Sequence, residues 1–357
     1  MKIDHKQFLT ALEACSAAIN TKHSMPILQG IELKDGRLTG TDLETTITAE
    51  IEIQDYAGEH IIFPAKHMLS VAKVSKKEIE IILDKDHSII TLTSGKSVYK
   101  IPVLPADDYV EIKPFPETSN KINIDAIKDG WSFIKHTVAV GNVNKSYGGV
   151  LLQKIPEGIE MATTDIHRLS LYQIKNMEIA DLKDSGVVVP ATAMDQITNL
   201  FAGEVEVAFI NHDQICIRHG GITFSGRMVA NEFPNYKGII NNKMIGTEVA
   251  VVQKNDFSQS IKRVMVISEA KIIATVITLA GNIISTKLDA DGISSSDEIL
   301  CEKGPDEEIT IGLNAKYLLD IQGTKINAVT EGGLTPFRTY EDTATYFYAT
   351  AIMPLRI

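Results

Sequence analysis

The sequence predicts an α+β fold made of three tandem repeats of one domain, each with two helices packed on antiparallel sheets. The first observation is length, because at roughly 100 to 200 residues per domain a 357-residue chain forms two or three domains. The second is an internal repeat. Residues 36–53 and 158–174 both run from an alternating strand into Thr-Asp and a second alternating strand, and Asp42 and Asp165 are 123 positions apart.

Each third of the chain opens with a strand and an amphipathic helix. We expect these helices at residues 6–19, 125–140 and 255–267, where apolar residues recur at helical spacing. The apolar positions are Phe8, Leu12 and Cys15 in the first helix, Ile127, Trp131, Ile134 and Val138 in the second, and Phe257, Ile261 and Val264 in the third.

A second helix in each third has a matching start. Pro64, Pro190 and Asn314 precede the expected helices at spacings of 126 and 124 residues. Proline suits the first helical turn, where its missing N–H has no partner to lose, and asparagine suits the N-cap. Around the helices, runs such as EIEIILD, SIITLTS and SVYKIPVL have the period-two pattern of antiparallel strands.

Polar or glycine-containing stretches separate the three repeats. They are PETSNK at 116–121 and NNKMIGT at 241–247. The expected domains are residues 1–120, 121–245 and 246–357.

Composition and the N-terminus limit the class of protein. A hydrophobic content of 44% and a charged content of 23% describe an ordinary folded chain. The first residues are too polar for a signal peptide, and no run of 18 apolar residues could span a membrane. Cys15, Cys216 and Cys301 lie far apart, without the spacing of a zinc site, and fit a reducing cytoplasm. We therefore expect a cytoplasmic protein without a metal.

Enzyme motifs are missing. The sequence has no phosphate-binding loop, GxGxxG, GxSxG or HExxH. The glycine-containing run 141–149 is interpreted as a connecting loop, and the run 288–298 as a solvated acidic loop rather than a calcium site. No cofactor and no catalysis are expected.

The most enzyme-like cluster is TDIHR at 164–168, where a histidine and a carboxylate lie close together. Its counterpart in the first repeat, TDLET, keeps Asp42 but has neither the histidine nor the arginine. A shared aspartate after a strand is explained by turn hydrogen bonds to the backbone. His167 and Arg168, unique to the middle repeat, are candidates for a recognition surface.

Charge is segregated along the chain. The formal net charge is −11, which by itself disfavours a nucleic-acid binder. Residues 38–65 contain six acidic residues and no Lys or Arg, whereas residues 64–77 contain four lysines and no acidic residue. Three other expected helices lean the same way less strongly, with Lys128 and Lys135 in one, Lys254, Lys262 and Arg263 in another, and Lys22 and His23 at the end of the first. A basic lining inside an acidic shell would attract a polyanion.

The chain resembles the bacterial DNA polymerase III beta subunit family, the sliding clamps. The resemblance rests on several short motifs in order over the entire length. They are SMPILQGIEL (24–33), GTDLE (40–44), TTDIHRLSL (163–171), EFPNY (232–236), IGLNAKYLLD (311–320) and MPLRI (353–357).

The resemblance implies a non-catalytic processivity factor for DNA replication. It implies a head-to-tail homodimer that closes into a ring, with helices lining the hole and sheets outside. Double-stranded DNA would be encircled without base readout. A clamp loader would open the ring, and the replicative polymerase and other proteins would bind through a short linear motif.

The resemblance also implies a partner-peptide pocket between the second and third domains. An apolar groove there would hold Leu and Phe side chains, with Arg168, His167 and Asn314 fixing the peptide backbone or a Gln. The matching positions are Tyr147, Thr164, Ile166, His167, Arg168, Leu169, Pro234, Ile239, Ile272, Asn314, Tyr317, Met353, Pro354, Leu355 and Arg356.

Three positions depart from the family pattern. Ile166 stands where the family commonly has Gly, Gly238 where a basic residue is frequent, and Ile272 where an aromatic residue can occur. Pocket shape and motif preference therefore stay open.

The resemblance implies the dimer contact, and charge and resemblance together indicate the DNA-facing residues. Tyr109 and Ile112 of one subunit are expected to meet Val266 and Ile267 of the other in the dimer. Helix 190–200 has no basic residue, so its share of DNA-facing charge must come from Lys145, Arg227 or nearby loops. The expected DNA-facing residues are Lys22, Lys66, Lys73, Lys76, Lys77, Lys135, Lys145, Arg227 and Lys262.

Two other functions stay open from the residues alone. One is an acidic scaffold that binds peptides but does not encircle DNA. The other is a hydrolase that uses Asp165 and His167.

Overall fold

The computed structural model describes most of the chain, with short gaps. Its described ranges are 1–76, 78–106, 109–141, 145–211, 213–270, 272–290 and 292–356. Within them the chain forms two compact units. We call residues 1–124 and 192–228 the first unit, and residues 125–191 and 229–357 the second unit.

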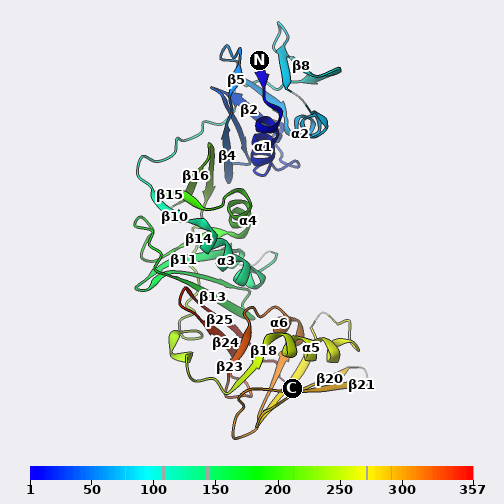
Figure 1. Cartoon of the computed structure of the whole chain (residues 1–357), viewed down its shortest axis with the longest axis vertical. Helices are drawn as coiled ribbons and strands as arrows, with labels where there is room; N and C mark the ends of the chain where they lie inside the picture. Colours follow the sequence, from blue (N-terminus) through cyan, green and yellow to red (C-terminus); the bar gives the residue numbers. More distant parts are fainter. Residues whose placement is uncertain are drawn as a thin grey trace. The chain divides into compact units, whose positions relative to one another are not determined.

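The described residues contain two helices in each third of the sequence, as predicted (Figure 1). The expected helix at 125–140 is shorter, because the α-helix ends at Ile134 and one 3₁₀ turn, Lys135–Thr137, follows. The α-helices are α1 (His5–Ser16), α2 (Ala65–Val74), α3 (Ile124–Ile134), α4 (Ala191–Leu200), α5 (Lys254–Met265) and α6 (Ala315–Leu319).

The first unit contains two antiparallel sheets. An eight-stranded sheet has the order β10-β15-β16-β17-β4-β3-β2-β6, and a five-stranded sheet has the order β5-β1-β7-β8-β9. The strands are β1 (Lys2–Ile3), β2 (Gly30–Lys34), β3 (Arg37–Thr41), β4 (Thr45–Glu50), β5 (Ile53–Gln54), β6 (Ile61–Pro64), β7 (Ile79–Leu83), β8 (Ile89–Ser94), β9 (Ser97–Pro102), β10 (Asn120–Asn123), β15 (Glu204–Ile210), β16 (Gln214–His219) and β17 (Ile222–Arg227).

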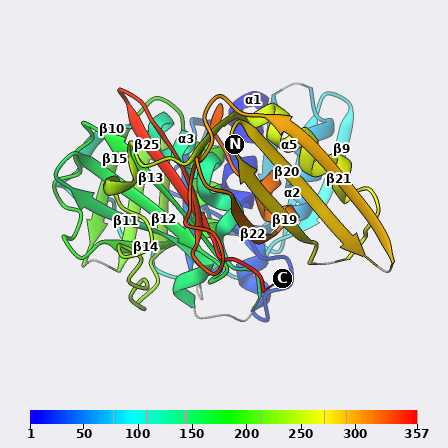
Figure 2. The same ribbon diagram turned by 90° about the horizontal axis from the view of Figure 1, so that it is seen from below.

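The second unit repeats this plan. An eight-stranded sheet has the order β14-β11-β12-β13-β25-β24-β23-β18, and a four-stranded sheet has the order β21-β20-β19-β22 (Figure 2). The strands are β11 (Gly149–Ile155), β12 (Gly158–Thr164), β13 (Arg168–Lys175), β14 (Val187–Pro190), β18 (Ala250–Gln253), β19 (Ala274–Ala280), β20 (Ile283–Ala290), β21 (Ile293–Leu300), β22 (Ile309–Asn314), β23 (Lys325–Val329), β24 (Phe337–Asp342) and β25 (Tyr346–Ile352).

Each eight-stranded sheet joins strands from neighbouring thirds of the sequence. In the first unit β4 pairs with β17, from Thr45 opposite Gly226 to Ala49 opposite Ile222. In the second unit β13 pairs with β25, from Arg168 opposite Ile352 to Ile174 opposite Tyr346. The compact units therefore divide the middle third between them, and the division into domains of residues 1–120, 121–245 and 246–357 stays a prediction.

Two loops were expected from composition, at residues 288–298 and 141–149. The expected acidic loop at 288–298 is wrong, because these residues lie mainly in the hairpin of β20 and β21, with Gly292 at positive φ in the turn. Three serines followed by Asp297 and Glu298 hid that strand, since polar residues can occupy both faces of an outer strand. In the glycine-containing run 141–149, residues 142–144 lie outside the described residues and Lys145–Gly148 form a 3₁₀ turn.

Helix α1 shows how the sequence builds the core. The Asp4 side chain caps the helix by accepting the Gln7 N–H at 2.9 Å. Phe8, Leu12 and Cys15, predicted from their spacing, are buried where α1 packs on β3, β4 and α2. In the described part of the chain, no helix combines the length and apolar character needed to cross a bilayer.

Close packing of α1 on β3 generates a first prediction. A Cβ at Gly40 would lie 2.3 Å from the carbonyl oxygen of Cys15. Gly40→Ala must therefore push α1 from the sheet, and we expect a loss of about 1–3 kcal/mol in the free energy of unfolding, measured by urea denaturation. Gly238→Ala is the control, because a Cβ there meets nothing within 4 Å. Equal stability of the two variants would contradict the packing described.

Candidate functional site

The loop between β12 and β13 is held by its own polar side chains. Asp165 Oδ1 accepts the N–H of His167 at 3.1 Å and of Arg168 at 2.9 Å. Thr164 Oγ1 accepts the Ile166 N–H at 3.1 Å and donates to the Arg168 carbonyl at 2.8 Å. The predicted role of Asp165 in a backbone turn is therefore confirmed.

The loop between β3 and β4 has the same hydrogen bonds. Asp42 Oδ1 accepts the N–H groups of Glu44 and Thr45 at 3.1 and 2.8 Å. Thr41 Oγ1 accepts the Leu43 N–H at 3.1 Å and donates to the Thr45 carbonyl at 2.9 Å. The repeated Thr-Asp is thus a structural motif of both units.

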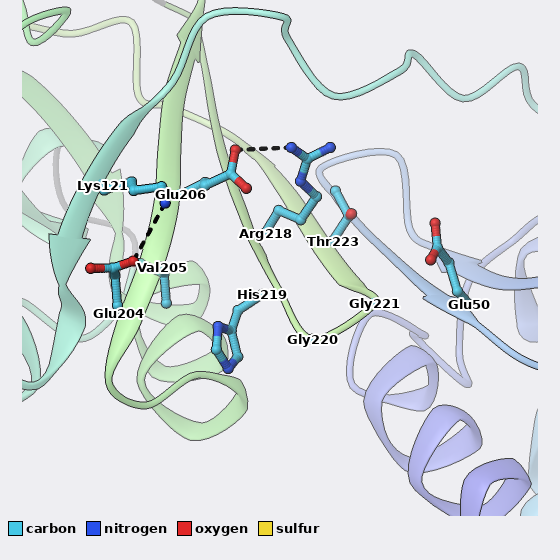
Figure 3. A pocket seen from close by; sticks show the side chains of 10 residues that line it. All are labelled: Glu50, Lys121, Glu204, Val205, Glu206, Arg218, His219, Gly220, Gly221 and Thr223. Atoms are coloured by element: carbon cyan, nitrogen blue, oxygen red, sulfur yellow. Dashed lines mark hydrogen bonds and ion pairs between the residues drawn. The ribbon is translucent and has the colours of Figure 1, made fainter.

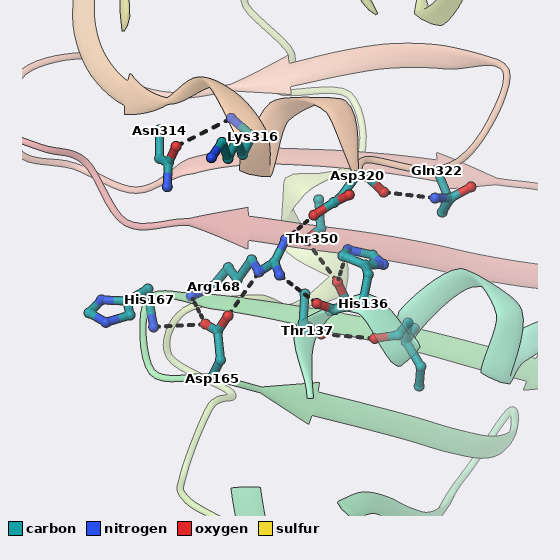
Figure 4. A network of polar contacts seen from close by, with 12 residues as sticks. His136, Thr137, Asp165, His167, Arg168, Asn314, Lys316, Asp320, Gln322 and Thr350 are labelled. Carbon is teal, nitrogen blue, oxygen red and sulfur yellow. Dashed lines mark hydrogen bonds and ion pairs between the residues drawn. The ribbon is translucent and has the colours of Figure 1, made fainter. Parts of the chain in front are cut away.

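Arg168 joins three elements of the second unit (Figure 4). Its Nε donates to Asp165 Oδ2 at 2.9 Å, and its Nη1 donates to Asp320 Oδ2, beyond α6, at 2.5 Å. Its Nη2 donates to the carbonyl of His136 at 2.5 Å, and the guanidinium lies 4.2 Å from the centre of the Tyr317 ring. With 12% of its side chain exposed, Arg168 holds the loop, the 3₁₀ turn after α3 and the end of α6 in place.

The C-terminal residues run from this loop to β22. The Met353 N–H donates to the His167 carbonyl at 2.8 Å. The Leu355 N–H donates to the Gly312 carbonyl, also at 2.8 Å. Met353, Pro354 and Leu355 are half-buried, and Arg356 is exposed. We call residues 353–356 the tail.

The Asn314 side chain is buried and makes hydrogen bonds within the fold. Its Oδ1 accepts the N–H of Lys316 at 3.2 Å, which caps α6, and the N–H of Ile273 at 3.4 Å. Among the three polar anchors named from the sequence, His167 is the exposed one. Arg168 and Asn314 hold neighbouring elements of the second unit in place.

The remaining predicted pocket residues divide by burial. Ile166 and Ile272 are 56% and 61% exposed. Thr164 and Leu169 are buried, and Leu169 belongs to a core against which Ile239 packs. The half-buried ones are Tyr147, Pro234, Ile239 and Tyr317. The structure therefore brings the loop 164–168, the tail and the start of α6 onto one part of the second unit.

A buried carboxylate behind this region was missed from the sequence. Glu160 on β12 is 4% exposed, and its Oε1 accepts a short hydrogen bond from the Tyr236 hydroxyl. Its Oε2 accepts the Gln173 Nε2 at 2.8 Å. Burial and the nearby carboxylate raise the pKa of Tyr236. Tyr236, in the EFPNY motif, thus ties the segment after β17 to the sheet of the second unit, and strand alternation alone gives no signal for such a contact.

The expected DNA-facing residues are exposed wherever they are described. Lys73 and Arg227 lie 3.9 Å from Glu13 and Glu44, in exposed pairs that contribute little to stability. Lys77 lies outside the described residues. The others are Lys22, Lys66, Lys76, Lys135, Lys145 and Lys262.

The expected dimer residues have different surroundings. The Tyr109 hydroxyl donates to the Thr39 carbonyl at 3.1 Å, and burial raises its pKa. Tyr109 and Ile112 line a groove of about 720 Å³ in the first unit, on its eight-stranded sheet. Val266, directly after α5, is 82% exposed, and Ile267 packs against the core of the second unit.

A second hollow of the first unit is lined by charges of both signs (Figure 3). It has a volume of about 380 Å³. Arg218 pairs with Glu206 at 2.9 Å, and Lys121 pairs with Glu204 at 3.7 Å. Within the lining, Glu204 and Glu206 thus each have a basic partner. In the described ranges, no group of three or more His, Cys, Asp or Glu residues could hold a metal ion.

His136 generates a prediction about pH. Burial, with the Arg168 charge nearby, lowers its pKa to about 4. The unfolded chain keeps a histidine of pKa about 6.5, so between pH 6.5 and 4 it binds a proton that the folded chain does not. The free energy of unfolding must therefore fall as the pH falls through this window.

We expect the wild type to lose about 1–3 kcal/mol more than His136→Gln between pH 7 and pH 4. Urea denaturation across that range measures the difference. Parallel pH profiles for the two proteins would contradict the burial of a neutral His136.

Comparisons with known proteins agree along the whole chain. Residues 1–113 match the model of the DNA polymerase III beta subunit, N-terminal domain, and residues 125–235 match that of its central domain. The chain is 23% identical to the beta sliding clamp of Pseudomonas aeruginosa, over 90% of this chain and 89% of that protein. It is 22% identical to the beta sliding clamp of Proteus mirabilis, over 99% of each.

Solved structures share the fold. The DNA polymerase III subunit beta of Pseudomonas aeruginosa superposes with a TM-score of 0.88 at 19% identity, covering 100% of both chains. A sliding clamp of Bartonella birtlesii, solved bound to griselimycin, gives a TM-score of 0.87 at 21% identity over 100% of this chain and 99% of that one. The chain belongs to the DNA polymerase III beta subunit family, the family of the beta sliding clamps.

Proposed function

We propose that two copies of this chain close into a DNA sliding clamp, a ring that encircles duplex DNA and tethers the replicative polymerase and other DNA-processing proteins without catalysis. The observation that carries the proposal is the match to beta sliding clamps over the full length of the chain. The Asp165 turn supports it against the hydrolase, since the same turn recurs at Asp42, where no histidine follows.

The DNA-facing surface of the proposed ring is basic. Exposed lysines on α2 and α5, together with Lys22, Lys135, Lys145 and Arg227, would meet phosphates rather than bases. A duplex held in this way can slide, because no base-specific contact fixes it. In the same proposal a clamp loader opens the ring, and the chain itself supplies no nucleotide site.

The partner site of the proposal is the surface around the loop 164–168 and the tail. Ile166, Ile272 and the half-buried tail offer apolar area, and His167 offers an exposed polar group. A short peptide with Leu and Phe side chains fits such a surface.

The same proposal includes three clamp domains, at residues 1–120, 121–245 and 246–357. It also places the protein in the cytoplasm. The buried free thiols suit a reducing compartment.

Ring closure predicts a dimer. Light scattering should give twice the 39.2 kDa of one chain. Val266→Asp should lower the dimer fraction at a fixed concentration, because it places a charge on an apolar contact that is 82% exposed in one chain. Val140→Asp, at a valine that is 96% exposed and outside the proposed contact, is the control. A wild-type monomer at micromolar concentration would overturn the ring.

The exposed position of His167 leads to a prediction about peptide affinity. His167→Ala should weaken binding of a fluorescent Gln-Leu-x-Leu-Phe peptide by about five- to tenfold, since one exposed polar contact is lost, and should leave the dimer intact. Arg168→Ala should in addition lower the unfolding midpoint, because Asp165 and Asp320 lose their partner. His219→Ala, at an exposed histidine of the first unit, is the matched control. Unchanged peptide affinity in His167→Ala would refute this site.

A further inference from the structure

In the first unit a long loop crosses one face of the eight-stranded sheet. That face points away from the helices, because it includes Thr39, whose neighbour Gly40 packs against α1 on the other face. The loop leads from β9 to β10, and the Tyr109 hydroxyl bonds to the Thr39 carbonyl (Figure 1). We call residues 109–119 of this loop the strap.

In the second unit the segment after β17 lies on the corresponding face. Tyr236, Ile240 and Met244 of this segment are buried in an apolar core that they form with the sheet. The sheet residues of this core are Leu151, Ala162, Leu169, Leu171, Val188, Tyr340, Phe347, Ala349 and Ala351. Detaching the segment would expose this surface to water, so the hydrophobic effect keeps it in place. We call residues 233–244 the second-unit segment.

The matching sheet positions of the first unit are polar. The two sheets can be matched through their strand pairing, since β12, β13 and β25 repeat the register of β3, β4 and β17 from the shared Thr-Asp turn onward. The core residues Leu151, Ala162, Leu169, Leu171, Tyr340, Ala349 and Ala351 correspond in this order to Glu32, Thr39, Thr46, Thr48, Arg218, Thr223 and Ser225.

The strap consequently lies over a groove rather than on an apolar core. All seven polar residues line the groove of about 720 Å³, and so do residues 109–115 of the strap. A groove of this size, lined by hydroxyl and charged groups, has room and partners for water. Lifting the strap therefore uncovers hydrophilic sheet residues, in contrast to the apolar core of the second unit.

Side-chain contacts hold the strap on both sides of the β4–β17 pairing. Tyr109 bonds to β3 at 3.1 Å, and the Phe115 ring centre lies 4.3 Å from the guanidinium carbon of Arg218 on β16. Ser119 donates to Glu206 Oε2 on β15 at 2.9 Å. Contacts of this kind are individually weak. The strap thus spans the pairing through which the first and middle thirds of the sequence share one sheet.

We propose that the strap detaches from the sheet on its own, while the rest of the first unit stays folded. The second-unit segment stays on its sheet until the second unit unfolds, because the apolar core holds it. One chain therefore contains a releasable cover and a permanent cover on corresponding faces of its two sheets. Release of the strap leaves the β4–β17 pairing without the side-chain contacts that span it.

Native cysteines can report this detachment. Cys216 lies two residues before Arg218 on β16, and therefore on the groove face, and it is 2% exposed. Its partner in the strand pairing, Ser225, lines the groove. Cys15 is also buried, but it lies on α1 at the other face of the sheet. The two thiols therefore distinguish release of the strap from unfolding of the first unit.

The test follows alkylation of both thiols by iodoacetamide with mass spectrometry, at several urea concentrations below the unfolding transition. Local release exposes little surface, so modification through it speeds up only weakly with urea, whereas modification through global unfolding speeds up steeply. We expect Cys216 to react faster than Cys15 and with the weaker urea dependence. Phe115→Ala should speed Cys216 modification about three- to tenfold and keep the weak dependence, since the contact with Arg218 is lost.

Two controls come from the second unit. Phe233→Ala removes a ring that packs on Tyr236 at 5.7 Å, and it should leave the Cys216 rate unchanged. Ala349→Cys places a thiol beneath the second-unit segment, at the counterpart of Thr223, and this thiol should react only with the steep urea dependence. Ala351→Cys serves the same purpose if Ala349→Cys does not fold.

Equally steep urea dependences at Cys216 and Cys15 would overturn the release of the strap. An unchanged Cys216 rate in Phe115→Ala, or an equal acceleration in Phe233→Ala, would overturn it too. A weak urea dependence of the thiol beneath the second-unit segment would overturn the contrast between the two units. The proposed clamp function is tested separately, by the dimer and peptide measurements.

Discussion

The pairing of β13 with β25 is the constraint on which the second unit depends. It joins residues 168–174 to residues 346–352 across most of the chain. This pairing places the end of β25 beside the loop 164–168, so that the Met353 N–H reaches the His167 carbonyl. Such a contact closes a long loop of chain, and its entropic cost is offset by a continuous sheet with buried residues on both faces. Without that register the tail and the loop would not form one surface.

Arg168 fixes the loop 164–168 against neighbouring elements of the second unit. Two carboxylates, a carbonyl and the Tyr317 ring surround a guanidinium that is largely withdrawn from water. A buried ion pair of this kind contributes little net stability, yet removing one partner leaves an uncompensated charge. Arg168 therefore fixes the positions of the loop 164–168, the 3₁₀ turn after α3 and the end of α6 relative to one another. In the proposed partner site, recognition would fall to side chains that remain exposed, such as His167.

Local structure was predictable from the sequence, and long-range pairing was not. The helices around Phe8 and Phe257, the strands of residues 79–102 and the Thr-Asp turns followed from spacing and residue type, because these act over a few residues. The joining of β4 to β17, and the use of Arg168 and Asn314 inside the fold, depend on partners more than 100 residues away. Periodicity carries no information about such partners. The resemblance to sliding clamps predicts where the partner site lies, and it gives no indication of the positive φ of Ile166.

A net charge of −11 agrees with a clamp once its distribution is considered, because residues 38–65 contain six acidic residues and no Lys or Arg, whereas residues 64–77 contain four lysines and no acidic residue. Topological linkage to DNA is the central claim. The most direct measurement loads labelled protein onto a nicked circular DNA with a clamp loader, washes with high salt, and follows the bound label before and after one restriction cut. We predict retention on the circle and release within seconds to minutes of the cut, through the new ends. Label that stays bound after linearisation, or that the salt wash removes from the intact circle, would contradict encirclement.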